Sequence, residues 1–479
     1  MSSAVAARYV PMATFCSCAI VTLLGFAWLA QLAAELGGIN SGVGSDSTPK
    51  ILAIALLLLI PSAVVMFILP RLNSSGVILG CVFLVGLLLR VMFLPLEPGF
   101  TDDFYRYLWD GRVQASHLNP YGVAPSDPAL DEVESRFPEE DRVRAFVNHP
   151  EIPTVYPPQL ELTFATAQRL DHRFEGIPDF GLRGGLLMWK LLLLIADVCL
   201  ALLLIRALEG MNRNRCWLIL YWWHPLPVIE TAWNAHAELI PVLFFVWCTV
   251  LLTEERRGLA GVALGGAIAA KILPIGFLLA LFRRGGSVAL ILCFATLCWL
   301  STPFVGVDLH SALAGLGEYA ESWYFNDLVY RPFGYLLQLD PENRHAPTSQ
   351  LLRFALGAGW VCVVLMTSSR SPYSAGLALT GGFVILSPTV HPWYLLWVLP
   401  FAALLHRPSW WLLAGTTLIA YEVVIGWRAA GVWEPAAGTR WLVYAAPLGL
   451  MLWSFVREIL DRRETRRLLA EIASPDAHS

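Results

Sequence analysis

Apolar runs about as long as a bilayer is thick recur along this chain, and they constrain its fold more than any other feature. An α-helix needs about 20 apolar residues to cross a hydrocarbon core of ~30 Å. Because no water is available there, the backbone must pair within itself, as it does in a helix. The runs therefore predict an all-α polytopic membrane protein. They lie at 12–34, 51–70, 76–95, 184–205, 216–230, 236–253, 287–304, 350–368, 375–388, 393–405, 409–427 and 441–456.

The composition leads to the same class of protein. Only 15% of the residues are charged, against roughly a quarter in an average soluble protein. This excludes a soluble enzyme, a disordered chain and a secreted disulfide scaffold. The nine cysteines lie in or beside apolar runs without disulfide or zinc spacing, so we expect buried apolar side chains. With a net charge of −4 and no basic block outside the C-terminal tail, we expect no nucleic-acid partner.

The runs amount to about twelve spans, and two further segments are ambiguous. Residues 158–170 are amphipathic but too short to cross a bilayer, and we expect an interfacial helix. Residues 258–282 have arginines at both ends and Lys271 in the middle. This segment is either a re-entrant hairpin of two half-helices or one more span. We expect the first run to be a retained span rather than a cleaved signal.

The arginines predict the orientation, since basic residues concentrate in short cytoplasmic loops. If the N-terminus is cytoplasmic, the inner segments hold most of the arginines, Arg206 and Arg283 among them, and the outer loops hold few. Both termini are then cytoplasmic. We expect one transmembrane domain over residues 1–457, with a large extracytoplasmic loop at 96–182 after the third span. A basic cytoplasmic tail follows at 458–479.

Six polar and aromatic clusters collect at the outer ends of the predicted spans. The inner loops carry little beyond arginine, so the outer face is predicted to be the working face. The clusters are Asp102-Asp103, Asn119-Pro120-Tyr121, Tyr156-Pro157-Pro158, residues 234–238, residues 324–332 and His391-Pro392-Trp393-Tyr394.

The densest cluster opens the long loop with the sequence FTDDFYRYLWDGR. Adjacent carboxylates beside aromatic rings suit a sugar, because hydroxyls pair with carboxylates and ring faces stack on aromatic side chains. A carboxylate can also remove the proton of an attacking hydroxyl. Alternatively, Asp102 or Asp103 caps the helix starting at Phe104, and the two roles are compatible. The residues expected to contact substrate are Tyr105, Arg106, Tyr107, Trp109, Asn119, Tyr121, Tyr156 and Glu238.

Five cationic or hydrogen-bonding side chains are candidates for binding a phosphate, and most have a structural alternative. Arg90 can extend to the interface, and Lys271 can pair with a carboxylate inside the membrane. His236 can hold a metal or phosphate or join a hydrogen-bonded interface cluster, and His391 can belong to an aromatic belt. Arg331 is the fifth candidate. In the fourth span, Lys190 and Asp197 are positioned to pair with each other.

In their order and sidedness, these motifs resemble the GT-C superfamily of integral membrane glycosyltransferases. The closest resemblance is to polyprenyl-phosphate-mannose-dependent mannosyltransferases and bacterial glycosyltransferase family 87. The shared features, between about Arg90 and Pro400, are Asp102-Asp103, Tyr156-Pro157-Pro158, Lys271 before Leu273-Pro274, and His391-Pro392-Trp393-Tyr394. Two positions depart from the pattern: His117 stands where these proteins commonly have Gly, and Glu238 where Asp or Asn is expected.

The resemblance implies inverting transfer of a hexose from a polyprenyl-phosphate donor, with mannose as the first expectation. The acceptor would be a hydroxyl of a glycan, lipid or other cell-envelope molecule at the outer face of a bacterial inner membrane. Asp103 would act as the general base, Asp102 would orient a substrate, and the five candidates above would hold the leaving phosphate. No nucleotide-sugar site is implied, and the chain has no phosphate-binding loop or dinucleotide fingerprint.

This interpretation requires no cofactor. Asp102 and Asp103 could bind a divalent cation, but two adjacent carboxylates are too few ligands to predict a site. Two other functions stay open. A transporter or flippase for lipid-linked sugars would need discontinuous helices in matched halves. A non-catalytic assembly subunit would use the outer loop to bind a partner.

Overall fold

A computed structural model describes residues 3–41, 47–72, 76–138, 142–173, 182–306, 324–343 and 346–473, with the backbone alone at 3–9 and 462–473. Within these ranges the chain is helical and has no strand; the β pairing present is a parallel bridge between Phe325 and Thr389. The prediction of an all-α polytopic fold is confirmed.

The helices follow the predicted apolar runs closely. They are α1 (Ser3–Leu36), α2 (Thr48–Leu57), α3 (Leu59–Ile68), α4 (Gly76–Val91), α5 (Asp103–Ala115), α6 (Asp131–Glu134), α7 (Pro158–Arg173), α8 (Leu186–Gly210), α9 (Ile219–Trp222), α10 (Pro225–Pro227), a π-helix (Val228–Trp233), α11 (Leu239–Thr253), α12 (Arg257–Ala270), α13 (Leu278–Ser301), α15 (Tyr330–Leu336), α16 (Pro347–Thr367), α17 (Pro372–Leu386), α18 (Leu399–Leu404), α19 (Pro408–Thr416), α20 (Val423–Ala430) and α21 (Thr439–Ala473). Short 3-10 turns are Leu69–Arg71, Pro128–Leu130, Arg144–Phe146, Arg215–Leu218, Leu273–Phe277, Thr302–Phe304, Pro392–Leu396 and Thr417–Glu422.

Among the described residues, seven helical stretches are long and apolar enough to cross a membrane. They are Val10–Leu36, Thr48–Arg71, Leu186–Gly210, Leu273–Phe304, Pro347–Thr367, Pro408–Ala430 and Thr439–Asp461. Shorter apolar helices of 10–17 residues lie at Gly76–Val91, Leu239–Thr253, Arg257–Ala270, Pro372–Leu386 and Pro392–Leu404. The total of about twelve spans stays a prediction.

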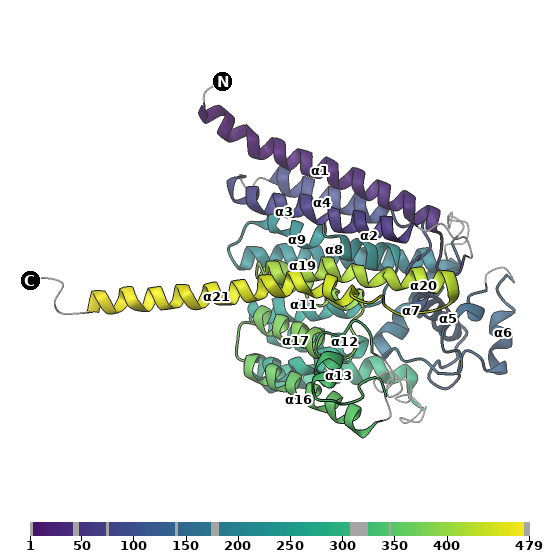
Figure 1. The fold of residues 1–479 in the computed structure, drawn as a ribbon. Helices are drawn as coiled ribbons and strands as arrows, with labels where there is room; N and C mark the ends of the chain where they lie inside the picture. The colour runs from purple at the N-terminus through teal and green to yellow at the C-terminus, as the bar shows by residue number, and fades with distance from the viewer. Residues whose placement is uncertain are drawn as a thin grey trace, which may run out of the picture.

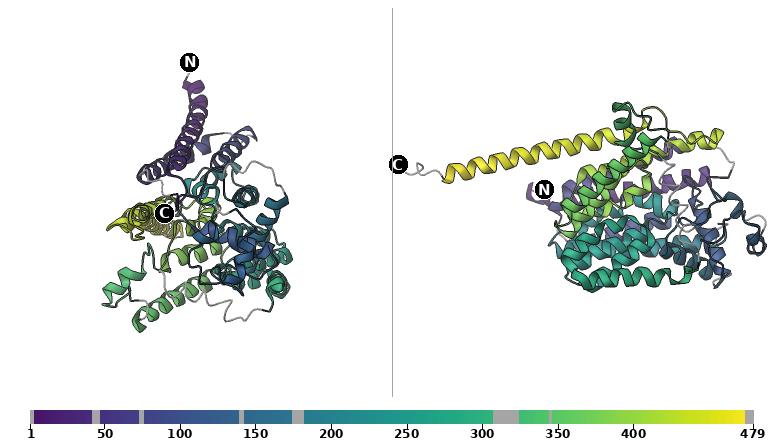
Figure 2. Two further views of the ribbon diagram at one scale, coloured as in Figure 1. Left: turned by 90° about the vertical axis from the view of Figure 1, so that its right-hand side faces the viewer. Right: turned by 90° about the horizontal axis from the view of Figure 1, so that it is seen from below.

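The long helices lie side by side in a bundle, and α5, α6 and α7 gather at one end of it (Figure 1). The start of α1 and the end of α21 lie at the other end, and α21 projects past the bundle in Figure 1 and in the right-hand view of Figure 2. This helix continues without a break through the predicted boundary at residue 457. Residues 474–479 of the predicted tail lie outside the described residues.

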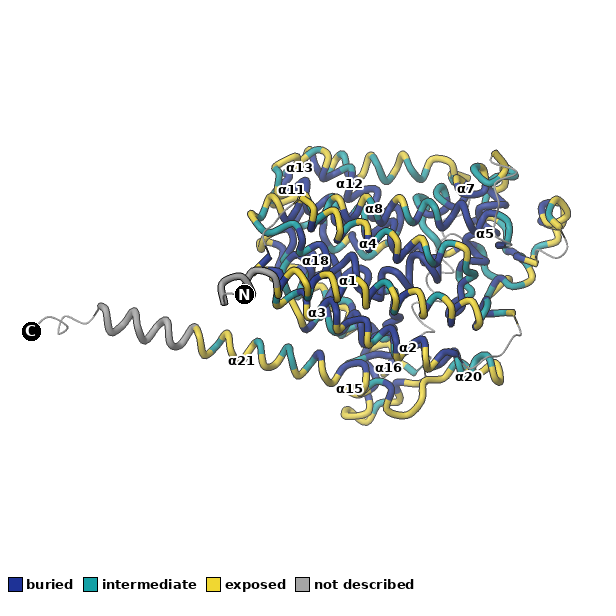
Figure 3. The backbone as a smooth tube through the Cα atoms, turned by 90° about the horizontal axis from the view of Figure 1, so that it is seen from above, coloured by how far each residue is buried: buried dark blue, intermediate teal, exposed yellow. Residues whose placement is uncertain are grey.

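Exposed residues lie along the outer faces of the bundle (Figure 3), and many of them are apolar, as lipid contact requires. Trp28, Phe67, Ile195 and Val288 are each more than half exposed, whereas the inner faces of the helices are buried. Polar residues inside the bundle are therefore the exceptions that need an explanation, and two clusters of them, around Asp103 and around Arg90, are described below.

Both ambiguous segments are helical. The predicted helix at 158–170 is α7, which extends to Arg173 and packs on α5 through stacked Tyr107 and Phe164 rings, 4.9 Å between centroids. The segment at 258–282 is a pair of helices broken at Lys271, whose backbone is extended (φ −158°, ψ 142°), with Pro274 preventing the helix from continuing. α12 and α13 approach closely because Gly261 has no side chain. A Cβ at this position would lie 2.1 Å from the Ala289 carbonyl oxygen.

Candidate active site

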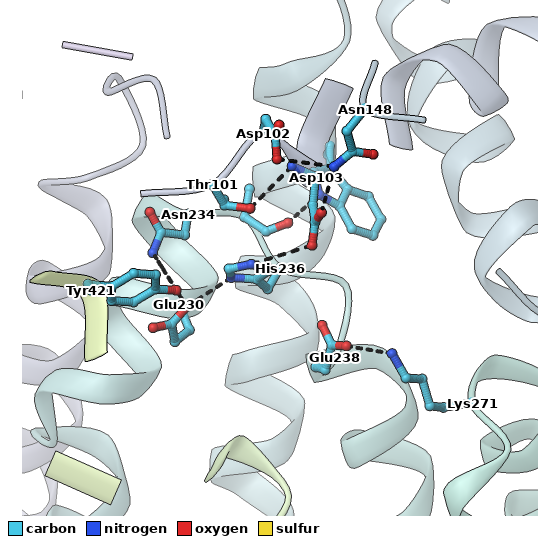
Figure 4. A network of polar contacts seen from close by, with 12 residues as sticks. Thr101, Asp102, Asp103, Asn148, Glu230, Asn234, His236, Glu238, Lys271 and Tyr421 are labelled. Carbon is cyan, nitrogen blue, oxygen red and sulfur yellow. Dashed lines mark hydrogen bonds and ion pairs between the residues drawn. The ribbon is translucent and has the colours of Figure 1, made fainter. Parts of the chain in front are cut away.

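Asp102 and Asp103 lie at the start of α5, at the end of the bundle where α5, α6 and α7 gather (Figure 1), and Figure 4 shows them from close by. Asp102 occupies the N-cap position, yet its side chain makes no capping bond, so the capping role considered for it is wrong. The hydroxyl of Thr101 instead accepts from the Asp103 backbone N–H at 3.2 Å. The Asn148 amide donates to Asp102 at 3.1 Å and to Asp103 at 3.4 Å, so one side chain holds both carboxylates.

The segment before these aspartates is fixed through its backbone carbonyl groups. Lys190, fully buried in α8, donates to the carbonyls of Phe93, at 3.0 Å, and Leu96. The Trp233 indole donates to the Glu97 carbonyl at 2.9 Å, and Arg428 donates to the Gly99 carbonyl at 3.3 Å. The expected Lys190–Asp197 pair is therefore wrong, since these carbonyl groups take up the Lys190 ammonium.

A π-helix at Val228–Trp233 brings a second group of polar side chains to the same place. It is followed by Ala235 in the left-handed region (φ +59°), and the His236 N–H donates to the Glu230 carbonyl at 2.8 Å. π-turns and left-handed non-glycine residues recur at functional sites, because the surrounding structure must offset their strain. Here they turn His236 and Glu230 toward each other.

His236 lies between two carboxylates (Figure 4). Its Nδ1 is 2.8 Å from Glu230 Oε2, and its Nε2 is 3.8 Å from Asp103 Oδ2. The Tyr421 hydroxyl donates to the same Glu230 oxygen at 2.8 Å. Both His236 and Glu230 are fully buried, whereas the Asp103 side chain is 26% exposed. The line of contacts thus ends at a carboxylate that a substrate can reach.

Lys271 pairs with Glu238 next to this line (Figure 4). The two charged atoms are 2.7 Å apart, and Glu238 is buried while the Lys271 side chain is 32% exposed. The break between α12 and the following turn presents Lys271 at this position. The carboxylate partner that the sequence left unidentified is therefore Glu238, and part of the ammonium is still accessible.

His391 joins the site through a stack of rings. His236 stacks on Trp393 with 4.1 Å between ring centroids, and Trp393 stacks on His391 at 4.2 Å with an angle of 2° between their planes. Phe325 covers the far face of His391 at 4.9 Å. The bridge between Phe325 and Thr389 fixes that end of the stack. Both predicted histidines, His236 and His391, therefore belong to one continuous stack of rings.

The site carries an excess of negative charge, with Asp102, Asp103, Glu230 and Glu238 around Lys271 and His236. Burial, with a contribution from Glu238, raises the pKa of Asp103, while His236 and Lys271 oppose the rise. Burial and the neighbouring Asp103 raise the pKa of Asp102 to about 6. A carboxylate whose proton affinity is raised toward neutrality is suited to act as a general base.

Two of the predicted phosphate ligands lie elsewhere. Arg90 is fully buried, with its Nε 2.6 Å from Asp197, and it donates to the Trp222 carbonyl at 2.8 Å. Arg331 pairs with Asp327 at 2.6 Å through its Nε. His236 and Lys271 thus lie in the network around Asp103 and His391 joins it through Trp393, whereas Arg90 and Arg331 are held by their own carboxylates.

The residues predicted to contact a sugar also fall into two groups, one near the candidate site and one whose contacts are within the loop. Burial raises the pKa of Tyr156 well above its ordinary value, with Asp103 and Glu238 contributing, and the Tyr107 ring packs against it with 5.2 Å between centroids. The others build the loop. Tyr105 and Trp109 are buried, Arg106 pairs with Asp110 at 2.9 Å, Asn119 accepts from the Tyr121 N–H at 3.1 Å, and Tyr121 donates to the Tyr156 carbonyl at 2.6 Å.

His117 has a left-handed backbone (φ +63°), which explains why a glycine would suit this position.

The sequence interpretation missed Glu230, Tyr421 and Asn148. Glu230 could have been found, because it is a lone carboxylate inside an apolar run, the signal that singled out Lys271. Tyr421 and Asn148 carry no such signal, since their role depends on contacts from distant parts of the chain. No group of three His, Cys, Asp or Glu side chains within the described ranges is arranged to hold a metal ion.

Comparison with known proteins bears on the class of this protein. The sequence model of glycosyltransferase family 87, a GT-C-type family, matches residues 155–388. This range contains Tyr156, Glu230, His236, Glu238 and Lys271. The predicted resemblance to family 87 is confirmed, and the match supports a membrane glycosyltransferase. No curated protein and no solved structure matched the chain.

Proposed function

Starting from a membrane glycosyltransferase that resembles family 87, we propose that this protein transfers a hexose, mannose in the first instance, from a polyprenyl-phosphate donor. The acceptor is a hydroxyl group of a glycan, lipid or other cell-envelope molecule at the outer face of the membrane. The observation that carries the proposal is the Asp103 carboxylate, partly exposed, with His236 at 3.8 Å and the Glu238–Lys271 pair beside it.

Asp103 takes the proton of the acceptor hydroxyl as its oxygen attacks the anomeric carbon. The bond between that carbon and the donor phosphate breaks, and the electron pair leaves with the polyprenyl phosphate. Attack from the opposite side inverts the anomeric centre. Burial supports this role for Asp103, because it raises the pKa of the group that must accept a proton.

The leaving phosphate gains negative charge as the bond breaks, and Lys271 is the partly exposed cation nearest this network. A fixed cation in a site with little water stabilises such developing charge strongly. His236, held by Glu230 at Nδ1, directs Nε2 toward Asp103 and the reacting atoms. His391, behind Trp393, supports the same ring stack and is the next candidate for the phosphate.

The test is transfer of radiolabelled mannose from synthetic polyprenyl-phosphate-mannose to extracted membrane glycans, with purified protein in nanodiscs. We expect transfer by the wild type and none by Asp103→Asn. The matched control is Asp127→Asn, a conservative change in the same loop, where Asn can keep the capping bond that Asp127 makes to the Ala129 N–H. Equal transfer by the wild type and Asp103→Asn would remove the general-base assignment.

Donor and cation dependence are measured in the same assay. Polyprenyl-phosphate glucose, galactose and arabinose, offered separately, identify the sugar if mannose is not transferred. A sample treated with EDTA tests whether a divalent cation bound at Asp102 and Asp103 is required. Absence of transfer with every donor, from intact protein with acceptor present, would favour a transporter of lipid-linked sugars.

A further inference from the structure

A cavity of about 230 Å³ lies at the far end of α5 from Asp103, outside the network described above. It is formed by the last turn of α5, the segment after α6 and the last turns of α7. Its lining residues are Arg112, Ala115, Ser116, Arg136, Phe137, Gln168, Arg169 and His172. Among the lining residues that the structure describes, three are arginines and none is acidic, which is the reverse of the charge balance around Asp103.

The arginines reach the cavity from three different segments. Arg112 is buried, with its guanidinium 3.8 Å above the Phe137 ring and one nitrogen donating to the Gly184 carbonyl at 3.1 Å. Arg136 is exposed and pairs with Glu132 at 2.8 Å. Arg169 is exposed on α7. Cations fixed from several directions around one space suit an anion with several oxygen atoms.

Gln168 provides a neutral donor at the same place. Its side chain is buried, at 2% exposure, and its amide nitrogen has no hydrogen-bond partner in the part of the chain that the structure describes. The amide lies against Gly185, where any Cβ would collide with it at 2.0 Å. An unpartnered buried donor is costly, so an acceptor atom placed beside this amide would remove a destabilising feature.

The place of the cavity in the chain puts it near one end of a candidate membrane span. The Gly184 carbonyl that holds Arg112 comes two residues before α8, which is long and apolar enough to span the bilayer. Lipid phosphates lie where such spans end. Along α5, nine residues separate Arg112 from Asp103, or about 14 Å at 1.5 Å per residue. The cavity is thus separate from the site where a donor phosphate would lie under the proposed function.

We propose that this cavity binds the phosphate of an anionic lipid headgroup in the outer leaflet. Arg136 and Arg169 contact the phosphate oxygens, the Gln168 amide donates to one of them, and Arg112 shapes the floor of the cavity. The inference stands on these residues alone and does not depend on the glycosyl-transfer reaction.

The test measures binding of a short-chain phosphatidylglycerol to the full-length protein in a neutral detergent, by native mass spectrometry and by thermal stabilisation. Short-chain phosphatidylcholine, which is zwitterionic, is measured beside it. We expect saturable binding and stabilisation with phosphatidylglycerol and at least tenfold weaker binding with phosphatidylcholine. Equal binding of the two lipids would overturn the proposal.

Three variants locate the binding. Arg136→Gln and Arg169→Gln should each weaken phosphatidylglycerol binding about tenfold, since each removes a charge-assisted contact. Gln168→Leu should weaken it less. The matched control is Arg173→Gln, which removes an exposed arginine of α7 outside the lining and should leave the affinity unchanged. Equal losses in Arg169→Gln and Arg173→Gln would overturn the proposal, because they would indicate diffuse attraction to a basic surface.

Competition separates lipid from free anion. Inorganic phosphate should displace the lipid at high concentration, and sodium chloride at the same ionic strength should not. If inorganic phosphate binds as tightly as phosphatidylglycerol, the lipid is not the occupant. Unchanged melting of each variant without lipid shows that the protein stays folded.

Discussion

Two of the clusters of buried charge in this helical bundle differ in whether their charges are balanced. In the first, Arg90 and Asp197 pair at 2.6 Å from helices α4 and α8, both fully buried. The Tyr221 hydroxyl donates to the other Asp197 oxygen at 2.6 Å, and the Arg90 guanidinium lies 3.5 Å from the Trp222 ring centroid. One cation meets one anion, and their neighbours enclose them.

The second cluster surrounds Asp103 and is neither balanced nor closed. Four carboxylates face Lys271 and His236, and the side chains of Asp103 and Lys271 are 26% and 32% exposed. Left-handed Ala235 and the π-helix before it add backbone strain at this cluster, while the first cluster contacts the same π-helix through the Thr231 hydroxyl, which donates to Asp197 at 3.3 Å. A balanced and enclosed pair stabilises the architecture, whereas an accessible excess of one charge is typical of a site that binds or transfers something.

The largest expected effect tests this contrast directly. Asp103→Asn should lower transfer about 10³-fold, within the range that a general base contributes, because an amide cannot accept the hydroxyl proton. Its thermal midpoint should stay close to the wild-type value, since Asn keeps the contact with Asn148. Transfer assays and melting curves on the same preparation measure both quantities. A large loss of stability would mean that Asp103 is needed to hold the fold together, as Asp197 is, rather than for transfer.

Asp197→Asn is the converse experiment in the balanced cluster. It leaves Arg90 buried without its anion, and breaking such a pair costs about 3–5 kcal/mol of stability. Transfer per folded molecule should be nearly unchanged. The double variant with Arg90→Met should recover part of the lost thermal midpoint, because the uncompensated charge is gone. A catalytic defect in folded Asp197→Asn would show that this cluster is not purely structural.

The sequence predicted the helices well because hydropathy is a local property. Each apolar run became one helix or a group of short helices, and α7 appeared where an amphipathic pattern stood alone. The break at Lys271 was also visible, because a charge followed by Pro274 interrupts an apolar segment. Helix breaks such as the π-turn at Val228–Trp233 were not, since they depend on packing against neighbouring helices.

The candidate site was predicted in part, for the same physical reason. Asp103, His236 and Lys271 stand out because each is polar at the end of, or within, an apolar run. Pairing depends on three-dimensional contact, which the sequence does not show. From the sequence we expected Arg90 to bind a phosphate and Asp197 to pair with Lys190, whereas in the structure Arg90 and Asp197 pair with each other. Single-residue patterns found the charges but could not distinguish a balanced cluster from an open one.

Glu230→Gln sharpens the comparison within the open cluster. The amide removes a negative charge at Nδ1 of His236, so the imidazole loses its charge-assisted contact and its fixed orientation. We expect transfer to fall by about 10- to 100-fold, as loss of one such contact predicts. Tyr421→Phe, which removes the hydroxyl that donates to Glu230, should have a smaller effect in the same assay. If the two variants lose activity equally, Glu230 acts by holding the helices together.

The pH profile of transfer tests the charge balance through two partners of one ion pair. Transfer requires the ionised form of Asp103 and should rise with pH through its raised pKa. Glu238 raises that pKa and Lys271 lowers it. Glu238→Gln should therefore move the acidic limb of kcat/KM to lower pH, and Lys271→Met should move it to higher pH. Shifts in the same direction would show that the pair does not act on Asp103 electrostatically.

The smallest expected effect concerns the cost of the charge excess. Burial and Asp103 raise the pKa of Asp102 from its ordinary 3.8 to about 6 in the folded protein. The folded state therefore holds a proton that the unfolded state releases, and this group lowers stability as pH rises from about 4 to about 6.

Asp102→Asn should melt at a slightly higher temperature than wild type at pH 7, because the variant removes this unfavourable charge and no capping bond is lost. The difference should vanish below pH 4, where both forms are neutral. The same difference at both pH values would mean that packing, rather than charge, explains it. A lower midpoint at pH 7 would mean that neighbouring groups balance the negative charge of Asp102, as Arg90 balances that of Asp197. Asp103 would then be the carboxylate on which the difference between the two clusters rests.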